Sequence, residues 1–216
     1  MNRWRVAAPL ISALLAGAVS AAEPAHDMSS MTHDHAVMGH DHAASGAKQP
    51  ALGSSTYTTA DLMFLTHMIV HHQQALELCE LVPTHSSREA FHRFARYVND
   101  AQGAEIGQMQ ALLKLAAERG AMIPEQRFDA DPPMAGMLSK AQMAAIRAAA
   151  GIEFEQLWLN GMILHHQGAV DMALAQQAAQ FRDRNQPWGV DVMVDDMLVG
   201  QRGEIAKMRA WLAEWR

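Results

Sequence analysis

Two octets of nearly the same sequence carry adjacent histidines: MIVHHQQA at residues 68–75 and MILHHQGA at residues 162–169. Imidazole nitrogen and thioether sulfur together suit Cu(I), whereas imidazole with carboxylate suits Cu(II) or Zn²⁺. Burying an imidazole is costly unless its nitrogens have partners. A histidine pair repeated inside two apolar runs therefore predicts a metal site. The alternative, core histidines satisfied by ordinary hydrogen bonds, stays open at this point.

The spacing within each octet places the methionine beside its two histidines on a helix. The methionine precedes them by three and four residues, and residues at these separations are neighbours on a helix surface. The two histidines diverge by about 100° around the axis, so each octet presents a thioether with at least one imidazole. The methionines alone are also typical of core packing. The candidate ligands of the octets are Met68, His71, His72, Met162, His165 and His166.

A second matched pair of segments lies downstream, QGAEIGQM at residues 102–109 and QRGEIAKM at residues 201–208. In each segment a glutamate lies four residues before a methionine, so both side chains share one helical face. The glutamates either bind the ion themselves or accept hydrogen bonds from the histidines that bind it. The candidates that these segments add are Glu105, Met109, Glu204 and Met208.

Four long helices are expected to position these side chains, because apolar residues recur at helical spacing and no strand pattern is present. Threonine and aspartate signals open the first helix, and prolines mark the loop between the second and third. The expected helices cover about 59–83, 87–119, 139–181 and 190–215, and the proline-rich crossover loop covers 122–137.

The matched segments indicate that one helical hairpin is duplicated, at about residues 59–119 and 139–215. The octets are 94 residues apart and the downstream segments 99, and the difference falls in the turn between the two helices of a hairpin. Two hairpins that cannot bury their apolar faces alone pair into a four-helix bundle. Matched inner faces then converge near a pseudo-two-fold axis, where bundles build metal sites.

The segment at residues 23–56 is rich in alanine, serine, glycine, histidine and methionine and has no apolar periodicity. It is expected to be a disordered tail that captures metal loosely, since MTHDH and MGHDH repeat a dense array of donors. A solvated linker with incidental histidines is the alternative. The tail candidates are His26, His33, His35, His40, His42, Met28, Met31 and Met38.

The first 22 residues read as a signal peptide. Arg3 and Arg5 precede an apolar run at 6–19, and small residues follow at the expected cleavage site. The run is shorter than the roughly 20 apolar residues that a membrane-spanning helix needs, so no stable membrane anchor is expected. The sequence therefore predicts an exported protein, most simply a periplasmic one.

Composition excludes some classes of function. The chain of 216 residues has 17 Lys and Arg against 23 Asp and Glu, and the basic residues are scattered, so no nucleic-acid partner is expected. The single Cys79 cannot form a disulfide within the chain. It matches Ala173 in the second half, so no thiolate ligand is expected. His67, His85 and His92 have no matched partner and are left out of the site.

The doubled octet also carries a family resemblance. FLTHMIVHHQQALEL and LWLNGMILHHQGAVDMA, each followed by a helix with the pattern Q..EI..M, resemble the domain of unknown function 305 family over about residues 59–215. That family includes CopM-type periplasmic copper-binding proteins and is described as ferritin-like. The resemblance implies a four-helix bundle and, for several members, copper binding. One departure is Leu78, which stands where Met172 stands in the second half.

These observations favour a non-enzymatic copper-binding protein that sequesters or relays copper, as Cu(I) or Cu(II), with zinc less favoured. The expected partners are metal ions and a copper-handling protein; the sequence does not predict an oligomeric state. One alternative is a ferritin-like metal-dependent oxidoreductase, but the Glu-x-x-His pattern of di-iron bundles is missing from the octets. Another is a structural bundle without metal, in which the histidines bond to Glu105 and Glu204.

Overall fold

The computed structural model describes residues 57–126, 128–182 and 189–215, and these form helices and connecting segments with no strand. The helices are α1 (Thr59–His85), α2 (Glu89–Glu118), α3 (Lys140–Ala148), α4 (Gly151–Gln180) and α5 (Val190–Glu214). The all-α prediction is confirmed. The predicted signal peptide at 1–22 and the predicted metal-capturing tail at 23–56, with its eight candidate residues, lie outside the described residues.

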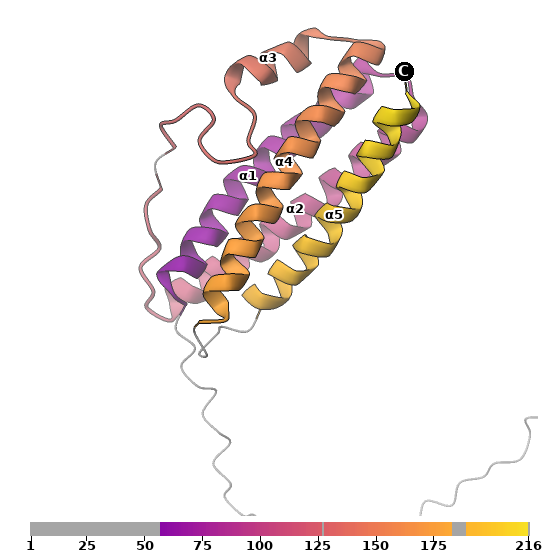
Figure 1. Cartoon of the computed structure of the whole chain (residues 1–216). Helices are drawn as coiled ribbons and strands as arrows, with labels where there is room; N and C mark the ends of the chain where they lie inside the picture. The colour runs from indigo at the N-terminus through magenta and orange to yellow at the C-terminus, as the bar shows by residue number, and fades with distance from the viewer. Residues whose placement is uncertain (1–56, 127, 183–188, 216) are drawn as a thin grey trace, which may run out of the picture. The chain divides into compact units, whose positions relative to one another are not determined.

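The four long helices pack side by side as a bundle (Figure 1). The most extensive contacts join α1 to α2 and α4 to α5, and α1 also packs against α4. The helices α1 and α4 run antiparallel, because Asp61 at the start of α1 bonds to Gln176 near the end of α4, and Ser86 after α1 bonds to Glu155 near the start of α4. The middles of α1 and α4, where the octets lie, therefore meet inside the bundle.

A capping box fixes the start of α1. The Thr58 side chain accepts a hydrogen bond from the backbone of Asp61 at 3.1 Å, and the Asp61 carboxylate accepts one from the backbone of Thr58 at 2.9 Å. This arrangement satisfies two backbone donors that the first turn of a helix leaves unpaired. The same carboxylate accepts a bond from Gln176, so the cap also joins α1 to α4.

Aromatic side chains hold one end of the bundle together. Phe91 packs edge-to-face on Trp158, with ring centroids 4.8 Å apart, and Phe94 packs on Trp211 at 5.1 Å. Trp158 donates its indole N–H to the carbonyl of Leu78 at 2.7 Å. Such aromatic pairs contribute about 0.5–1.5 kcal/mol beyond their buried area. The cluster links α1, α2, α4 and α5 at that end of the bundle and so fixes their registry.

Two expected helix boundaries are wrong. The single helix expected at 139–181 is divided into α3 and α4, because Ala149 and Ala150 are extended and Gly151 has φ +59°. A residue in the left-handed region favours glycine and ends a right-handed helix, which lets α3 fold back onto α4. The first helix continues past Pro83 to His85 because that proline lies in its last turn.

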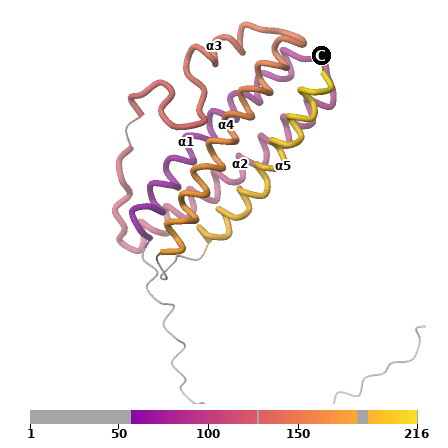
Figure 2. The backbone as a smooth tube through the Cα atoms, in the orientation of Figure 1, coloured from indigo at the N-terminus to yellow at the C-terminus, as the bar shows by residue number. Residues whose placement is uncertain are grey.

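The crossover between α2 and α3 contains no helix in its described residues, as the sequence predicts. It runs alongside α1 and dips toward α4 before it enters α3 (Figure 2). His67 on α1 contacts it through Gln126, with the ring nitrogen Nε2 2.6 Å from the amide oxygen. In the described part of the chain, no helix has the length and apolar character needed to cross a membrane.

Candidate metal centre

The structure buries both histidine pairs completely. The side chains of His71, His72, His165 and His166 are each 0% exposed. The four candidate methionines, Met68, Met109, Met162 and Met208, are also 0% exposed. Histidine is often half-exposed in folded proteins, so four fully buried imidazoles in one bundle need partners for their nitrogens.

The two octets meet where α1 packs against α4. The ring centroids of His71 and His165 are 3.8 Å apart, with the planes tilted by 37°. His165 also donates from Nε2 to the backbone carbonyl of His71 at 2.9 Å. Within each pair the rings are farther apart, 6.4 Å for His71 and His72 and 6.1 Å for His165 and His166. The four imidazoles thus form one layer across the two helices, which we call the histidine layer.

The outer histidine of each pair bonds to a glutamate on the next helix. His72 Nε2 lies 2.7 Å from Glu105 Oε2, and His166 Nε2 lies 2.5 Å from Glu204 Oε2. A carboxylate oxygen accepts, so each ring donates from Nε2, and the neutral form of such a ring has its lone pair on Nδ1. Carboxylates that hold metal-binding histidines act in this way: they fix the tautomer and the ring orientation. The geometry places the two glutamates as hydrogen-bond partners of the histidines.

The remaining ring nitrogens are buried without partners. Nδ1 of His72, His165 and His166 and both nitrogens of His71 lack a partner in hydrogen-bonding geometry. Each such atom costs about 1–3 kcal/mol in a native protein, and few are left unexplained. Three of these rings donate from Nε2 to an acceptor, so in the neutral ring the lone pair on Nδ1 lies in the core without a partner. This donor chemistry fits a bound metal ion.

Two buried glutamines add to the same set, and sequence reasoning did not include them among the ligands. Gln102 is 2% exposed and Gln201 is 3% exposed, and neither amide has a partner at its oxygen or its nitrogen. Each lies one helical turn before the glutamate that holds a histidine. The signal that could have found them is their matched position on the glutamate and methionine face.

Burial keeps the inner histidines neutral. The pKa of His71 is lowered to about 3, mainly by burial and then by the neighbouring His72 and His166, against a smaller opposing effect from the backbone of Ala135. Burial also lowers the pKa of His165 well below its usual value, reinforced first by His71. A neutral imidazole keeps a lone pair for a metal, whereas an imidazolium has none. Both inner rings are therefore competent ligands at neutral pH.

The methionines lie one turn to either side of the histidine layer. His72 faces Glu105 across antiparallel helices, so the helical rise puts Met68 level with Met109. By the same argument Met162 lies level with Met208, on the other side of the layer because α4 runs opposite to α1. The thioethers are thus distributed as one pair above and one pair below the imidazoles.

Among the described residues, no three His, Cys, Asp or Glu side chains are grouped as ligands for one ion. Imidazole, thiolate and carboxylate groups of this kind are the ligands of zinc and di-iron centres. Thioethers do not belong to that set of donors. Soft cations such as Cu(I) also bind methionine sulfur, and Met68, Met109, Met162 and Met208 are buried with the histidines.

The histidines and the cysteine that sequence reasoning left out have other roles. His67 bonds to Gln126, His85 lies against the carbonyls of Leu81 and Arg147, and His92 against that of Ser86. The thiol of Cys79 is buried and free, and burial raises its pKa, so it is present as the neutral thiol. None of these groups joins the histidine layer.

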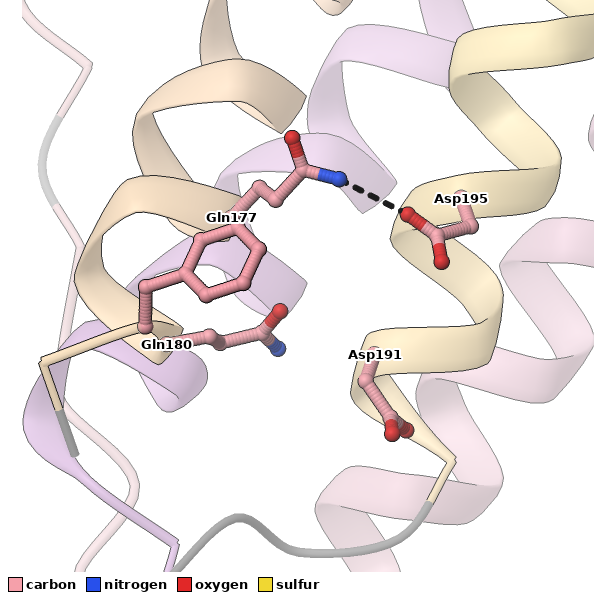
Figure 3. A pocket seen from close by; sticks show the side chains of 5 residues that line it. Gln177, Gln180, Asp191 and Asp195 are labelled. Atoms are coloured by element: carbon pink, nitrogen blue, oxygen red, sulfur yellow. Dashed lines mark hydrogen bonds between the residues drawn. The ribbon is translucent and has the colours of Figure 1, made fainter. Parts of the chain in front are cut away.

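A hollow lies between the end of α4 and the start of α5 (Figure 3), and no residue of the histidine layer lines it. Its lining residues are Gln177, Gln180, Phe181, Asp191 and Asp195. The amide of Gln177 donates to the Asp195 carboxylate at 2.8 Å across it. No candidate from the sequence lies there, and the hollow contains no imidazole, thiol or thioether.

Comparison with known proteins identifies relatives. The family model of DUF305, a domain of unknown function, matches residues 61–215. A DUF305 protein of Streptomyces coelicolor, described as secreted, is 30% identical with a TM-score of 0.61, covering 72% of this chain and 93% of that one. A DUF305 fragment from Deinococcus radiodurans is 29% identical with a TM-score of 0.62, covering 73% and 97%. No curated protein matches the chain.

The solved structures of CopM share the same fold. CopM in the Cu(I)-bound form is 24% identical to this chain with a TM-score of 0.56, and the match covers 74% of this chain and 98% of that one. CopM in the Cu(II)-bound form is 23% identical with a TM-score of 0.59, covering 72% and 97%. At this identity the likeness establishes the arrangement of the helices.

Proposed function

The chain belongs to the DUF305 family, and on that premise we propose that it is an exported copper-binding protein whose helical bundle holds the ion. The proposal extends to sequestration or relay of copper outside the cytoplasm, without catalysis. Its support from the relatives is that CopM, which has the same fold, binds Cu(I), Cu(II) and silver in its solved forms. Its support from this chain is the donor chemistry of the histidine layer.

The observation that carries the proposal is the set of unpartnered ring nitrogens in the core. A purely structural role for the histidines requires that both nitrogens of each ring be satisfied by the protein. Here the Nε2 atoms of His72, His165 and His166 have acceptors, but their Nδ1 atoms and both nitrogens of His71 do not. A metal ion that binds these lone pairs removes the cost of their burial.

The roles of the residues follow from their chemistry. His72 and His166 bind through Nδ1 while Glu105 and Glu204 orient them from the other side of the ring. The inner rings of His71 and His165 supply further neutral nitrogen. The thioethers that complete the soft donor set are those of Met68, Met109, Met162 and Met208.

Charge balance in the buried site is also consistent with a cation. Imidazole and thioether ligands are neutral, so they contribute no charge to offset that of an ion taken out of water. The carboxylates of Glu105 and Glu204 lie one ring away from the proposed ligands and supply negative charge near the ion. An ion of low charge, such as Cu(I), needs the least compensation, which favours it over Zn²⁺.

The rest of the chain is proposed to deliver copper to this site. A signal peptide at 1–22 exports the protein, and the tail at 23–56 collects ions with its histidines and methionines. The bundle, built from a duplicated hairpin, then binds one ion more tightly than the tail does. A copper-handling protein partner would take the ion onward. These assignments rest on the sequence patterns and on the relative that is described as secreted.

The experiment that tests the proposal measures copper, zinc and nickel binding to the mature protein with and without residues 23–56. We expect the shortened chain to retain tight copper binding with a preference over zinc and nickel. The variant pair His72→Ala and His166→Ala should abolish that binding, and the matched control His92→Ala, outside the layer, should not. Lack of any preference for copper in either form would refute the proposal.

The structural alternative predicts a different result in a melting experiment. A ligand that binds only the native state raises the melting temperature as its concentration increases. We expect copper to raise the melting temperature of the shortened chain, and this increase to disappear in the His72→Ala and His166→Ala double variant. A melting temperature that copper leaves unchanged would instead assign the histidines to hydrogen bonding alone.

A further inference from the structure

The crossover passes directly over the histidine layer at one short segment, residues 134–138, which we call the strap. Its turn is closed by a hydrogen bond from the Met137 N–H to the Met134 carbonyl at 3.2 Å. Gly136, inside the turn, has φ +81°, a conformation that favours glycine. The strap precedes α3 and lies between the two hairpins in the sequence (Figure 2).

The strap touches the backbone of α4 at Gly168. A Cβ atom added to Gly168 would lie 2.4 Å from the Ala135 carbonyl oxygen and 2.5 Å from the Gly136 Cα atom. No side chain fits between surfaces this close. Glycine in a helix interior is unfavourable compared with alanine, so its presence in the middle of α4 needs a reason. Backbone contact with the strap is that reason.

The strap is also held from α1 by one side chain. Gln74 donates from its amide nitrogen to the Leu138 carbonyl at 2.9 Å and accepts from the Leu138 N–H at 2.7 Å. The amide thereby satisfies both backbone groups of one strap residue. Gln74 stands in the first octet where Gly168 stands in the second. The one position at which the octets differ in chemical character is thus the position at which each contacts the strap.

Between these two attachments the strap lies against the inner histidines. A Cβ atom on Gly136 would lie 3.0 Å from the carbonyl oxygen of His165. The backbone of Ala135 also lies close enough to the ring of His71 to have a small effect on its pKa, opposite to that of burial. The peptide between Ala135 and Gly136 therefore lies beside the backbone of His165 and near the ring of His71.

We propose that the strap is the closure of the histidine layer, held by Gln74 and Gly168, and that its opening sets the rate at which a soft cation reaches or leaves His71 and His165. Gln74 and Gly168 are positioning residues for the site, because they act on the imidazoles through the strap. The identity of the cation rests on the proposed function above. The closure itself rests on the contacts between the strap and the two helices.

The test compares Gln74→Ala and Gly168→Ala with matched controls in the full chain without metal. The controls are Gln73→Ala, the exposed neighbour in the same octet, and Gly203→Ala, a helical glycine whose added Cβ meets no atom within 4 Å. Two rates are measured residue by residue: hydrogen exchange of the Leu138 amide, and modification of His71 and His165 by diethyl pyrocarbonate. We expect both test variants to increase both rates by about tenfold or more, and both controls to leave them unchanged.

The proposal is overturned if the Leu138 amide exchanges faster while modification of His71 and His165 stays within about twofold of wild type. Unchanged Leu138 exchange in both variants also overturns it, because Gln74 and Gly168 then do not hold the strap. Gln74→Glu keeps an acceptor for the Leu138 N–H but loses the donor, so intermediate rates are expected. If Gly168→Ala does not fold, the two Gln74 variants decide the question.

A second measurement connects the strap to copper. In the copper-loaded full chain, release of the slowest copper to a chelator should accelerate by about tenfold in Gln74→Ala, with the amount bound unchanged. An unchanged release rate refutes the role of the strap in exchange. If the wild-type bundle binds no copper, the proposed function fails, while the modification rates of the inner histidines still decide whether the strap closes the layer.

Discussion

The octet on α1 and the octet on α4 share their chemistry but differ in how they are covered. Both bury a methionine and two histidines, and both bond the outer histidine to a glutamate on the following helix. At residues 74 and 168 they diverge, because one carries an amide that grips the strap and the other carries no side chain. The matched residues are therefore those of the proposed site, and the unmatched position is where each octet contacts the strap.

The two halves also differ in the solvent exposure of their glutamates. The Glu105 side chain is 22% exposed, whereas that of Glu204 is 9% exposed, and both bond to histidines that are 0% exposed. A hydrogen-bonded pair is stronger, and more costly to break, when water cannot replace the lost partner. Breaking the hydrogen bond between His166 and Glu204 is therefore expected to cost more free energy than breaking the one between His72 and Glu105.

The largest expected effect comes from removing the outer histidines of both halves together. The His72→Ala and His166→Ala double variant should weaken copper binding by the bundle by at least about 1,000-fold, or about 4 kcal/mol, because two ligands are lost. The single variants should weaken it to similar extents if both halves serve one ion. Competition titration of the chain without residues 23–56 measures this. Copper affinity retained by the double variant would remove the octets from the site.

The next largest effect is expected from removing each glutamate, which compares the buried pair of His166 and Glu204 with the more exposed pair of His72 and Glu105. Glu204→Ala should lower the free energy of unfolding by about 3 kcal/mol, since it leaves a buried ring N–H unpaired. Glu105→Ala should lower it by about 1–2 kcal/mol, because water reaches that site. Urea denaturation of the metal-free chain measures both values. If Glu105→Ala lost more unfolding free energy than Glu204→Ala, the argument from solvent exposure would be contradicted.

The inner histidines predict a pH dependence of stability. The folded pKa of His71 is lowered to about 3, below the unfolded value of about 6.5, so the unfolded chain binds the proton first. Stability is complete above pH 6.5 and is lost as the pH falls from 6.5 toward 3. Between pH 6.5 and 5 one such group accounts for about 1.5 kcal/mol. Since the pKa of His165 is lowered in the same direction, both octets contribute.

The variant His71→Leu isolates the contribution of the first octet. Its loss of unfolding free energy between pH 6.5 and 5 should be smaller than that of wild type by about 1.5 kcal/mol. Denaturant unfolding at the two pH values, without metal, gives the comparison. The same loss in both proteins would show that His71 titrates normally and is not held neutral in the core.

The smallest effect is expected from the glutamine that the octets share. Gln73 and Gln167 follow the histidines at matched positions, but both are exposed. Replacing either with alanine should change the free energy of unfolding by less than about 0.5 kcal/mol and leave copper binding unchanged. Thermal melting and the copper titration check this. A marked loss of stability or copper binding in either variant would show that an exposed glutamine shared by the octets contributes to the site, although it is not buried.

Much of this arrangement could be predicted from the sequence because local signals determine it. Capping residues, prolines and helical periodicity predict the long helices, and the repeated octets predict which side chains share an interior. The division between α3 and α4 was missed because Ala149 and Ala150 carry no stop signal, and only the conformation of Gly151 reveals it. That the hairpin is duplicated remains a prediction.

Other features depend on tertiary geometry and could not be read from spacing. Whether Glu105 and Glu204 bind an ion or orient a ring depends on the distance between neighbouring helices, which the sequence does not give. The strap depends on a contact between residues far apart in the chain, and its only local trace is the exchange of Gln74 for Gly168. The eight tail candidates at 26–42 lie outside the described residues and remain predictions.

The most direct test of the account is a crystal structure of the copper-loaded chain. We predict an ion between α1 and α4, within coordination distance of Nδ1 of His72 or His166 and of at least one methionine sulfur, with both glutamates still bonded to Nε2. Copper found only on residues 23–56, with the histidine layer unchanged, would contradict the central claim.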